Sequence, residues 1–246
     1  KDSIDLFGAS TLLILMIILA LNQVVIKVGN DGFSPVFGAG LRSIIGFLIV
    51  FTWMRVRGFE LELPRTTWPA MTVFASLFTV EFIFLFIALD YTTVVRVSVI
   101  FYSMPVWMAL IGHFVLPGDR VTIVKALGLA IAFGGVVVAL TARGDALAGG
   151  SLIGDLLALA AAFCWAGIVL CAKGTNVSLL RPEMQLMTQL LVSGIILTAI
   201  SPLFGPLIRE LAPIHFAAIG FQALFVASGG FLFFLHFIQK KYLSML

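Results

Sequence analysis

The stretch that decides the fold is residues 69–89, PAMTVFASLFTVEFIFLFIAL. Only one ionisable side chain, Glu81, occurs in these 21 residues. An α-helix rises about 1.5 Å per residue, so about 20 apolar residues cross a hydrocarbon core roughly 30 Å thick. The stretch therefore predicts a transmembrane helix that carries one carboxyl group near its middle.

Apolar runs of similar length fill the rest of the chain. Short connections rich in Gly, Pro, Asn and Asp separate them, and none is long enough for a soluble domain. We predict eight membrane helices, at about 6–28, 36–57, 69–89, 91–116, 121–142, 152–173, 183–205 and 213–238. The predicted fold class is therefore all-α, a polytopic membrane helix bundle.

The composition agrees with an integral membrane protein. Of the 246 residues, 61% are hydrophobic and 11% are charged, whereas a soluble domain has about 25% charged residues. The 15 Lys and Arg and the 12 Asp and Glu residues are too few to cover a soluble surface of this size. This excludes an ordinary soluble enzyme, a disordered chain and a nucleic-acid-binding protein.

The basic residues in the connections predict an orientation. If the N-terminus is cytoplasmic, ten Lys and Arg residues fall on the cytoplasmic side, three fall outside and two lie within segments. An excess of Lys and Arg marks the cytoplasmic loops of membrane proteins. We therefore predict a multi-pass protein of the bacterial inner (plasma) membrane with a cytoplasmic N-terminus.

Small residues predict where helices approach each other closely. The second predicted segment contains Gly38, Gly40 and Gly46, and the fifth contains Gly128 and Gly134. Lipid supplies no hydrophobic force between helices, so membrane helices pack through small residues that bring backbones together.

The chain also resembles itself at an offset of 146–147 residues. Lys27 aligns with Lys173, and Pro35 aligns with Pro182. A repeat unit of this length holds five helices, and because five is odd the second copy enters the membrane from the opposite side. Such inverted repeats are typical of secondary transporters, whose substrate site lies between the two halves.

We therefore divide the chain into two repeats. Residues 1–148 form the first repeat of five helices, and residues 149–246 form the second, which is incomplete and has about three helices. The complete fold would have ten helices, of which eight are present. A truncated chain and an eight-helix relative both explain this deficit, and we favour truncation.

Motifs in both repeats follow a family pattern. They are Lys27, Pro35, Arg42, Ala88-Leu89-Asp90-Tyr91-Thr92-Thr93, Ser98, Pro105, Gly128, Gly134-Gly135-Val136, Gly154, Leu157-Ala158-Leu159-Ala160-Ala161-Ala162 and Trp165-Ala166. In these motifs the whole chain resembles the drug/metabolite transporter superfamily of the EamA type. The resemblance implies a ten-helix carrier that exports small metabolites, similar to bacterial amino-acid exporters of the YddG type. The sequence at 117–120, Pro-Gly-Asp-Arg, departs from the Gly-Glu pair that often ends the fourth helix in this family.

Polar side chains at membrane depth are the candidate substrate-binding residues, because burial in hydrocarbon is costly unless such groups are paired or hydrated. Aromatic neighbours at the same depth are included because they would line the cavity for an apolar part of the substrate. The predicted substrate-binding residues are Asn22, Gln23, Arg42, Glu81, Tyr102, Ser103, Trp107, Trp165, Gln185 and Gln189. The alternative is that these residues only hold the helices together.

Specific roles are predicted for two of the charged candidates. Glu81 is the predicted proton or cation site, and Arg42 is predicted to bind a substrate carboxylate. The alternative is a structural ion pair, in which Arg42 or Arg96 neutralises Glu81. Arg96 also fits a place at the outer rim, with its charge extended towards the membrane surface.

The sequence contains no phosphate-binding loop, metal-spaced His/Cys set or GxSxG serine. We therefore predict that the protein is not an enzyme, with no catalytic residues, no metal ligands and no cofactor. The predicted function is a secondary membrane transporter that moves amino acids or similar small metabolites outward by alternating access. The alternatives are a non-transporting membrane receptor and an intramembrane enzyme.

The expected partners follow from this function. They are a small-molecule substrate and the lipid bilayer, without nucleic acid. Proton coupling through Glu81 and uncoupled facilitation fit the sequence equally well, as do a monomer and a homodimer.

Overall fold

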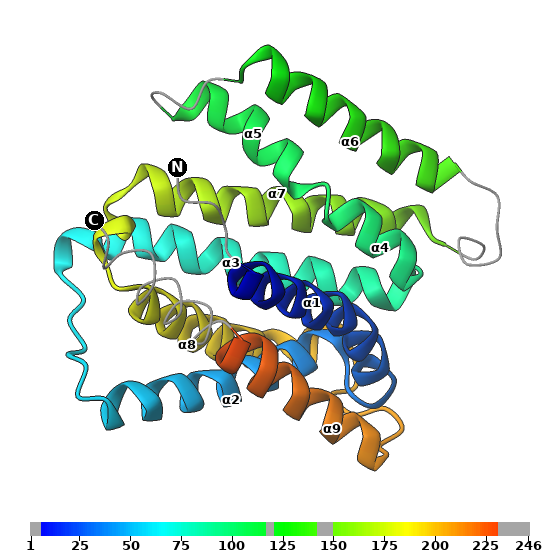
Figure 1. Ribbon diagram of the computed structural model, residues 1–246. Coiled ribbons are helices and arrows are strands. Elements are labelled where there is room, and N and C mark those ends of the chain that lie inside the picture. Colours follow the sequence, from blue (N-terminus) through cyan, green and yellow to red (C-terminus); the bar gives the residue numbers. More distant parts are fainter. Residues whose placement is uncertain (1–5, 117–120, 142–149, 231–246) are drawn as a thin grey trace.

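The computed structural model describes residues 6–116, 121–141 and 150–230 of the chain. They form a bundle of long helices that run along a common direction (Figure 1). The helices are α1 (Leu6–Gly32), α2 (Pro35–Val56), α3 (Trp68–Tyr91), α4 (Val94–Phe101), α5 (Met104–Val115), α6 (Ile123–Thr141), α7 (Leu152–Gly174), α8 (Pro182–Ile200) and α9 (Pro213–Phe221). A π-helix, η4 (Gln222–Gly230), continues α9, and short 3₁₀ turns lie at η1 (Arg65–Thr67), η2 (Asn176–Leu179) and η3 (Ser201–Phe204).

The fold class is confirmed as all-α. Within the described residues, five stretches are long and apolar enough to cross a membrane, and they are Pro35–Val56, Arg65–Tyr91, Val94–Val115, Leu152–Gly174 and Pro182–Phe204. Each predicted segment corresponds to a helix or to two consecutive helices. The part of the last predicted segment that follows residue 230 lies outside the described residues.

Two predicted segments are not continuous α-helices. The segment 91–116 is divided into α4 and α5 at Tyr102 and Ser103. Pro105 explains the division, because its ring has no N–H and clashes with the carbonyl four residues earlier, at Phe101. The segment that begins at 213 changes from an α-helix to the π-helix η4 at Gln222.

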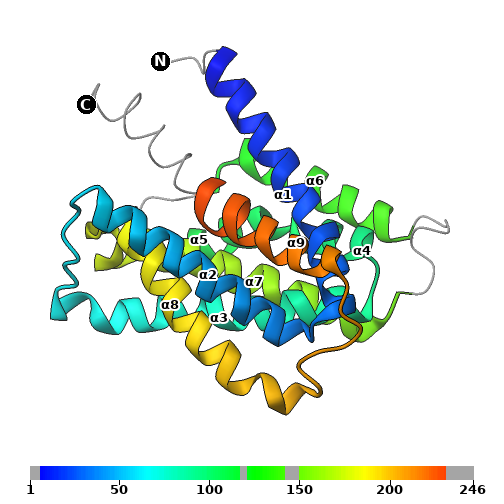
Figure 2. The ribbon, with the colours of Figure 1, turned by 90° about the horizontal axis from the view of Figure 1, so that it is seen from below.

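The helices of the two predicted repeats pack against each other in matching pairs. Under the repeat, α1 corresponds to α7, α2 to α8, and α3 to α9 with η4. The packing of α3 along α7 has its counterpart in α1 along α9 and η4, and the packing of α3 on α8 has its counterpart in α2 on η4. The pair of α2 and α8 is its own counterpart, and Figure 2 shows these two helices side by side.

Glycines allow the closest of these contacts. A Cβ atom placed at Gly40 would lie 2.9 Å from the backbone nitrogen of Thr198 in α8, and one at Gly46 would lie 3.1 Å from the Cβ of Ala227 in η4. The close contacts predicted for α2 are therefore present. A Cβ at Gly128 or Gly134 in α6 would meet no atom within 4 Å, so the described residues show no close contact there.

The largest hydrophobic core lies between α3 and α7. Phe82, Phe86 and Leu89 of α3 pack in one buried cluster with alanines of α7, including Ala158 and Ala162. The small alanine side chains let the aromatic helix α3 lie directly against α7. This core places the α3 face that carries Glu81 and Phe82 in the interior of the bundle.

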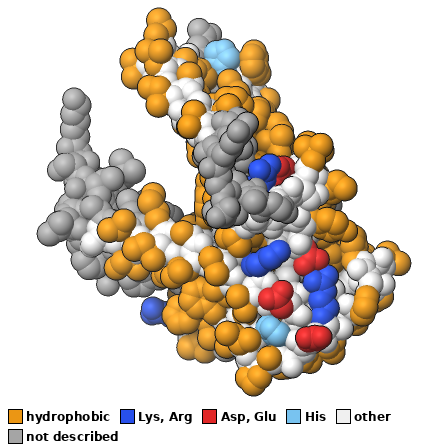
Figure 3. Space-filling view, turned by 90° about the vertical axis from the view of Figure 1, so that its right-hand side faces the viewer, with side chains coloured by type: hydrophobic (Ala, Val, Ile, Leu, Met, Phe, Trp, Pro, Cys, Tyr) orange, Lys and Arg blue, Asp and Glu red, His pale blue; other side chains and the backbone are white. Residues whose placement is uncertain are grey.

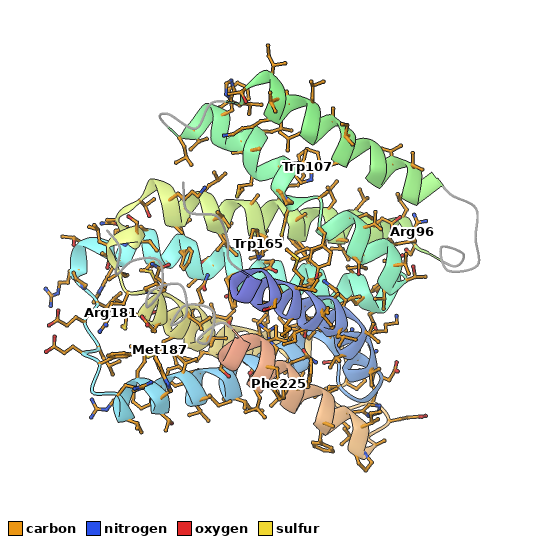
Figure 4. The ribbon with its side chains drawn as sticks, viewed as in Figure 1. Arg96, Trp107, Trp165, Arg181, Met187 and Phe225 are labelled. Atoms are coloured by element: carbon orange, nitrogen blue, oxygen red, sulfur yellow. The ribbon has the colours of Figure 1, made fainter. Side chains whose placement is uncertain are left out.

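The bundle has two chemically different ends. Figure 4 shows Arg96 at one end and Arg181 at the other. The connections after α1, α3 and α8 meet at the first end, and Asp90 lies there in the last turn of α3, so we call it the Asp90 end. We call the second the Arg181 end. Figure 3 looks onto the Asp90 end, where Lys and Arg side chains lie among Asp and Glu side chains with hydrophobic side chains around them.

Candidate substrate-binding site

Two ionisable side chains, one basic and one acidic, are buried in the interior of the bundle. Arg42 in α2 is 2% exposed and Glu81 in α3 is 3% exposed. The Arg42 guanidinium carbon lies 3.9 Å from the ring centroid of Phe82 and 5.9 Å from that of Phe86. The aromatic faces of α3 therefore hold the cation by cation–π attraction.

These two charges do not neutralise each other in an ion pair. They interact electrostatically, but the ion pairs formed among the described residues include neither Arg42 nor Glu81. The Nε atom of Arg42 is enclosed and has no hydrogen-bond partner among the residues that the structure describes. Buried charges in proteins are normally paired and hydrogen-bonded, and Arg42 and Glu81 depart from this rule among the residues that the structure describes.

Two neutral polar side chains on α1 are also buried with unpaired atoms. Asn22 is 7% exposed and Gln23 is 2% exposed. The side-chain carbonyl oxygen of each lacks a hydrogen-bond donor within the described part of the chain. Both residues were predicted as binding residues from the sequence. Gln189 in α8 is also buried, at 6% exposed. Three helices besides α3 thus contribute buried polar groups, and α8 belongs to the second predicted repeat.

The structure adds polar residues that sequence reasoning missed. Gln222 is the first residue of η4 and is fully buried, and neither its amide nitrogen nor its amide oxygen has a partner in the described ranges. Ser43 follows Arg42 in α2, and its buried hydroxyl also has no partner there. The signal for Gln222 was available, because it is an amide inside an apolar run, as Asn22 and Gln23 are. The signal for Ser43 was weak, because serine is common in membrane helices.

Arg96 has a different partner from the one considered for it. Its guanidinium binds the carboxylate of Asp155 in α7, with Nε 3.0 Å from Oδ1 and a further contact from Nη2. The Thr92 hydroxyl donates to the same carboxylate at 3.3 Å. Arg96 therefore joins α4 to α7 at the Asp90 end and is not the partner of Glu81. Asp155 was not singled out in the sequence.

The polar groups at the break between α4 and α5 satisfy one another. The Tyr102 hydroxyl donates to the Leu19 carbonyl at 3.1 Å, and the Ser103 hydroxyl donates to the Ile100 carbonyl at 2.6 Å. The indole N–H of Trp107 donates to the Ser103 hydroxyl at 3.0 Å. These bonds stabilise the break in the helix and use the donors that were predicted to face a substrate.

The two tryptophans pack against neighbouring side chains, and Gln185 forms hydrogen bonds with the backbone. Trp107 packs on Phe163, with ring centroids 4.5 Å apart, and Figure 4 shows it on the α5 side of the bundle. Trp165 packs against the core between α3 and α7. The Gln185 amide donates to the carbonyls of Val177 and Leu180 at 3.0 and 2.9 Å, so it fixes the turn before α8.

Five of the predicted residues are therefore buried polar groups of the interior. They are Asn22, Gln23, Arg42, Glu81 and Gln189. The structure gives Tyr102, Ser103, Trp107, Trp165 and Gln185 partners within the fold. We call the first five, together with Gln222, the interior polar group.

A model of the EamA-like transporter family matches residues 6–141 of this chain. The chain belongs to the EamA-like transporter family. The match covers more than half of the sequence, and the membrane helices and the transporter identity agree with the sequence prediction. The chain is thus a multi-pass membrane protein of a transporter family.

Two curated relatives come from Bacillus subtilis (strain 168). The uncharacterized transporter YvbV is 36% identical over 135 residues, which are 54% of this chain and 42% of that protein. The uncharacterized transporter YoaV is 24% identical over 143 residues, which are 58% of this chain and 49% of that protein. Each match spans about half the length of the relative.

A solved structure also shares the fold of this EamA-like chain. It is described only as a crystal structure of a protein, and it superimposes with a TM-score of 0.68 at 22% sequence identity. The superposition covers 91% of this chain and 77% of the other. Because the identity is low, this likeness supports the fold alone.

Proposed function

We propose that this EamA-like protein is a secondary carrier that moves amino acids or similar small metabolites outward by alternating access. The observation that carries the proposal is the pair of buried charges Arg42 and Glu81, which form no ion pair with each other. An amino acid carries a carboxylate and an ammonium group. Arg42 binds the carboxylate, Glu81 faces the ammonium group or a proton, and the amides of Asn22 and Gln23 complete the polar contacts.

The inverted repeat is the structural part of the proposal. Residues 1–148 and 149–246 form two related halves, and the matching helix pairs described above support this division. The interior polar group takes Arg42 and Glu81 from the first half and Gln189 and Gln222 from the second. Transport would then consist of rocking one half against the other around this group.

The orientation belongs to the same proposal. We place the Arg181 end in the cytoplasm and the Asp90 end outside, in a bacterial inner membrane with a cytoplasmic N-terminus. The distribution of Lys and Arg supports this choice. Proton coupling through Glu81 is the mode of energy input in this proposal, because an ionisable side chain buried within a membrane helix is costly unless it has a function.

Uptake into proteoliposomes tests the function. The intact protein is reconstituted, and the saturable flux of a panel of radiolabelled amino acids is measured for wild type, Arg42→Gln and Arg65→Gln. Arg65 is exposed in η1 and serves as the matched control. Removing one partner from a buried charge contact costs several kcal/mol, so we expect Arg42→Gln to lower kcat/KM at least about thirtyfold.

We expect Arg65→Gln to stay close to wild type. The proposal is wrong if the wild-type protein shows no saturable flux of any amino acid in the panel. It is also wrong if Arg42→Gln, folded as judged by size-exclusion chromatography, transports as well as Arg65→Gln does.

A further inference from the structure

Gln222 is the most unusual polar residue in the second half of the chain. Its side chain is 0% exposed, and both its amide nitrogen and its amide oxygen lack hydrogen-bond partners among the residues that the structure describes. Leaving a buried donor or acceptor unpaired costs about 1–3 kcal/mol. A fold that needed only packing at this position would be more stable with an apolar side chain of the same size.

Two contacts set the depth of Gln222 in the bundle. A Cβ atom at Gly38 of α2 would lie 3.7 Å from Ile219, and one at Gly46 would lie 3.1 Å from Ala227. Residues between Gly38 and Gly46 therefore face residues between Ile219 and Ala227 along the two helices. Gln222 lies at the same depth as Arg42, because both occupy the middle of these paired stretches.

A third contact places Gln222 on α1 as well. A Cβ atom at Gly29 would lie 3.4 Å from the Gln222 amide nitrogen. Gly29 and Asn22 are seven residues apart, so they lie on the same face of α1, about 10 Å apart along the helix. The Gln222 amide thus lies where α1, α2 and η4 meet, on the α1 face that also carries the unpaired Asn22.

The backbone at Gln222 is also unusual. Gln222 is the first residue of η4, in which the helix widens from an α-helix to a π-helix. Further along η4, the Ser228 hydroxyl donates to the carbonyl of Ala223, five residues earlier, at 2.5 Å. Short π-helices are rare and occur frequently at functional sites. The change of helix type coincides with the unpaired amide.

We propose that Gln222 is a substrate-binding residue that selects carboxylate compounds bearing a hydroxyl or amide group. Its neutral amide donates one hydrogen bond and accepts another, while Arg42 at the same depth binds the carboxylate. A group that both donates and accepts matches the two unpaired atoms, and an apolar isostere leaves both unpaired. This inference rests on the proposed transport function and specifies its substrate class.

The specificity test uses pairs of amino acids of nearly equal shape. Threonine and valine form one pair, and glutamine and methionine form the other. Inhibition constants for uptake into proteoliposomes are measured for wild type and Gln222→Met. A site built to hydrogen-bond a substrate group rejects the analogue that lacks it, so we expect wild type to prefer the polar member of at least one pair by about tenfold or more. In Gln222→Met this preference falls to within about twofold.

A stability measurement separates binding from a structural role, and Gln185 provides the matched control. Without substrate, Gln222→Met removes two unpaired buried atoms, so we expect a melting temperature in detergent equal to or above that of wild type. Gln185→Met removes two hydrogen bonds to backbone carbonyls, so we expect a lower melting temperature and an unchanged preference within each pair.

The outcomes distinguish this inference from the proposed function. If wild type transports amino acids but Gln222→Met keeps the same preference, or has a lower melting temperature as Gln185→Met does, the assignment of Gln222 is wrong and the carrier function stands. If wild type transports but prefers neither polar member, the assignment is also wrong. If wild type transports no amino acid, both proposals fail together.

Discussion

Arg42 and Arg96 show how one residue type takes two roles in the same membrane bundle. Arg96 binds a carboxylate of a neighbouring helix, Asp155, near the end of the bundle. Arg42 lies in the interior against Phe82 and forms no ion pair with any residue that the structure describes. The sequence predicts that both are costly to bury, but it does not predict their partners, because Asp155 is 59 residues away from Arg96.

The same contrast applies to the glutamines. Gln185 and Gln189 share a helical face by their spacing, and the sequence treats them alike. In the structure the Gln185 amide donates hydrogen bonds to backbone carbonyls of the preceding turn. Gln189 is buried one helical turn further along α8. Depth along the helix decides between the two roles, and depth depends on where α8 begins, which the sequence predicts only within a few residues.

Glu81 carries the prediction that belongs to the residue scale. If Glu81 is the proton site, wild-type flux changes with pH between about pH 5 and 8, and Glu81→Gln removes most of that change because the side chain no longer ionises. The measurement is initial uptake into proteoliposomes across this range. Glu62→Gln, at an exposed position, should keep the wild-type profile. An identical profile for Glu81→Gln and wild type would exclude Glu81 from coupling.

At the scale of secondary-structure elements, the existence of each helix was predictable and its internal irregularities were not. Length and hydropathy determine that a segment crosses the bilayer, and these are properties of one stretch of sequence. The division of α4 from α5 follows from Pro105 once the helix is known. The π-helix η4 packs against α1 and α2, and no local pattern in residues 213–238 indicates the change of helix type.

The contact between α2 and α8 carries the prediction at this scale. In Gly40→Ala the new methyl group meets the backbone of Thr198, so we expect a loss of about 1–3 kcal/mol in the free energy of unfolding. Gly128→Ala is the control, because its methyl group meets nothing within 4 Å. Thermal unfolding in detergent compares the two variants. Equal melting temperatures would show that α2 and α8 are not in close contact.

At the scale of the whole molecule, the two predicted halves are joined at the Asp90 end. Phe33 in the connection between α1 and α2 forms an antiparallel bridge with Ile208 in the connection between α8 and α9. Backbone hydrogen bonds flank it, from Ser34 to Leu207 at 3.0 Å and from Arg209 to Gly32 at 2.9 Å. Separation of the halves at this end must break the bridge.

An ion pair also spans the same junction. The Arg209 guanidinium makes two bonds of 2.8 Å to the Asp90 carboxylate and one of 2.9 Å to the Asn30 carbonyl. The hydrogen bond to Asp90 raises the pKa of Arg209 above its ordinary value, so Arg209 stays protonated at every pH of practical use. Both partners are partly exposed, so the pair contributes little net stability and opposes opening only weakly.

The measurement that tests the central claim most directly is counterflow with this junction locked. Phe33→Cys and Ile208→Cys are combined in a protein whose Cys164 and Cys171 are replaced by Ala. Opposed residues between the flanking hydrogen bonds of an antiparallel bridge have Cα atoms about 4.5 Å apart, which suits a disulfide. The single-cysteine proteins serve as controls. A carrier that works by alternating access predicts amino-acid counterflow when this disulfide is reduced, loss of counterflow when it is oxidised, and recovery with a reductant. Full counterflow in the oxidised protein, or none in the reduced protein, would contradict the account.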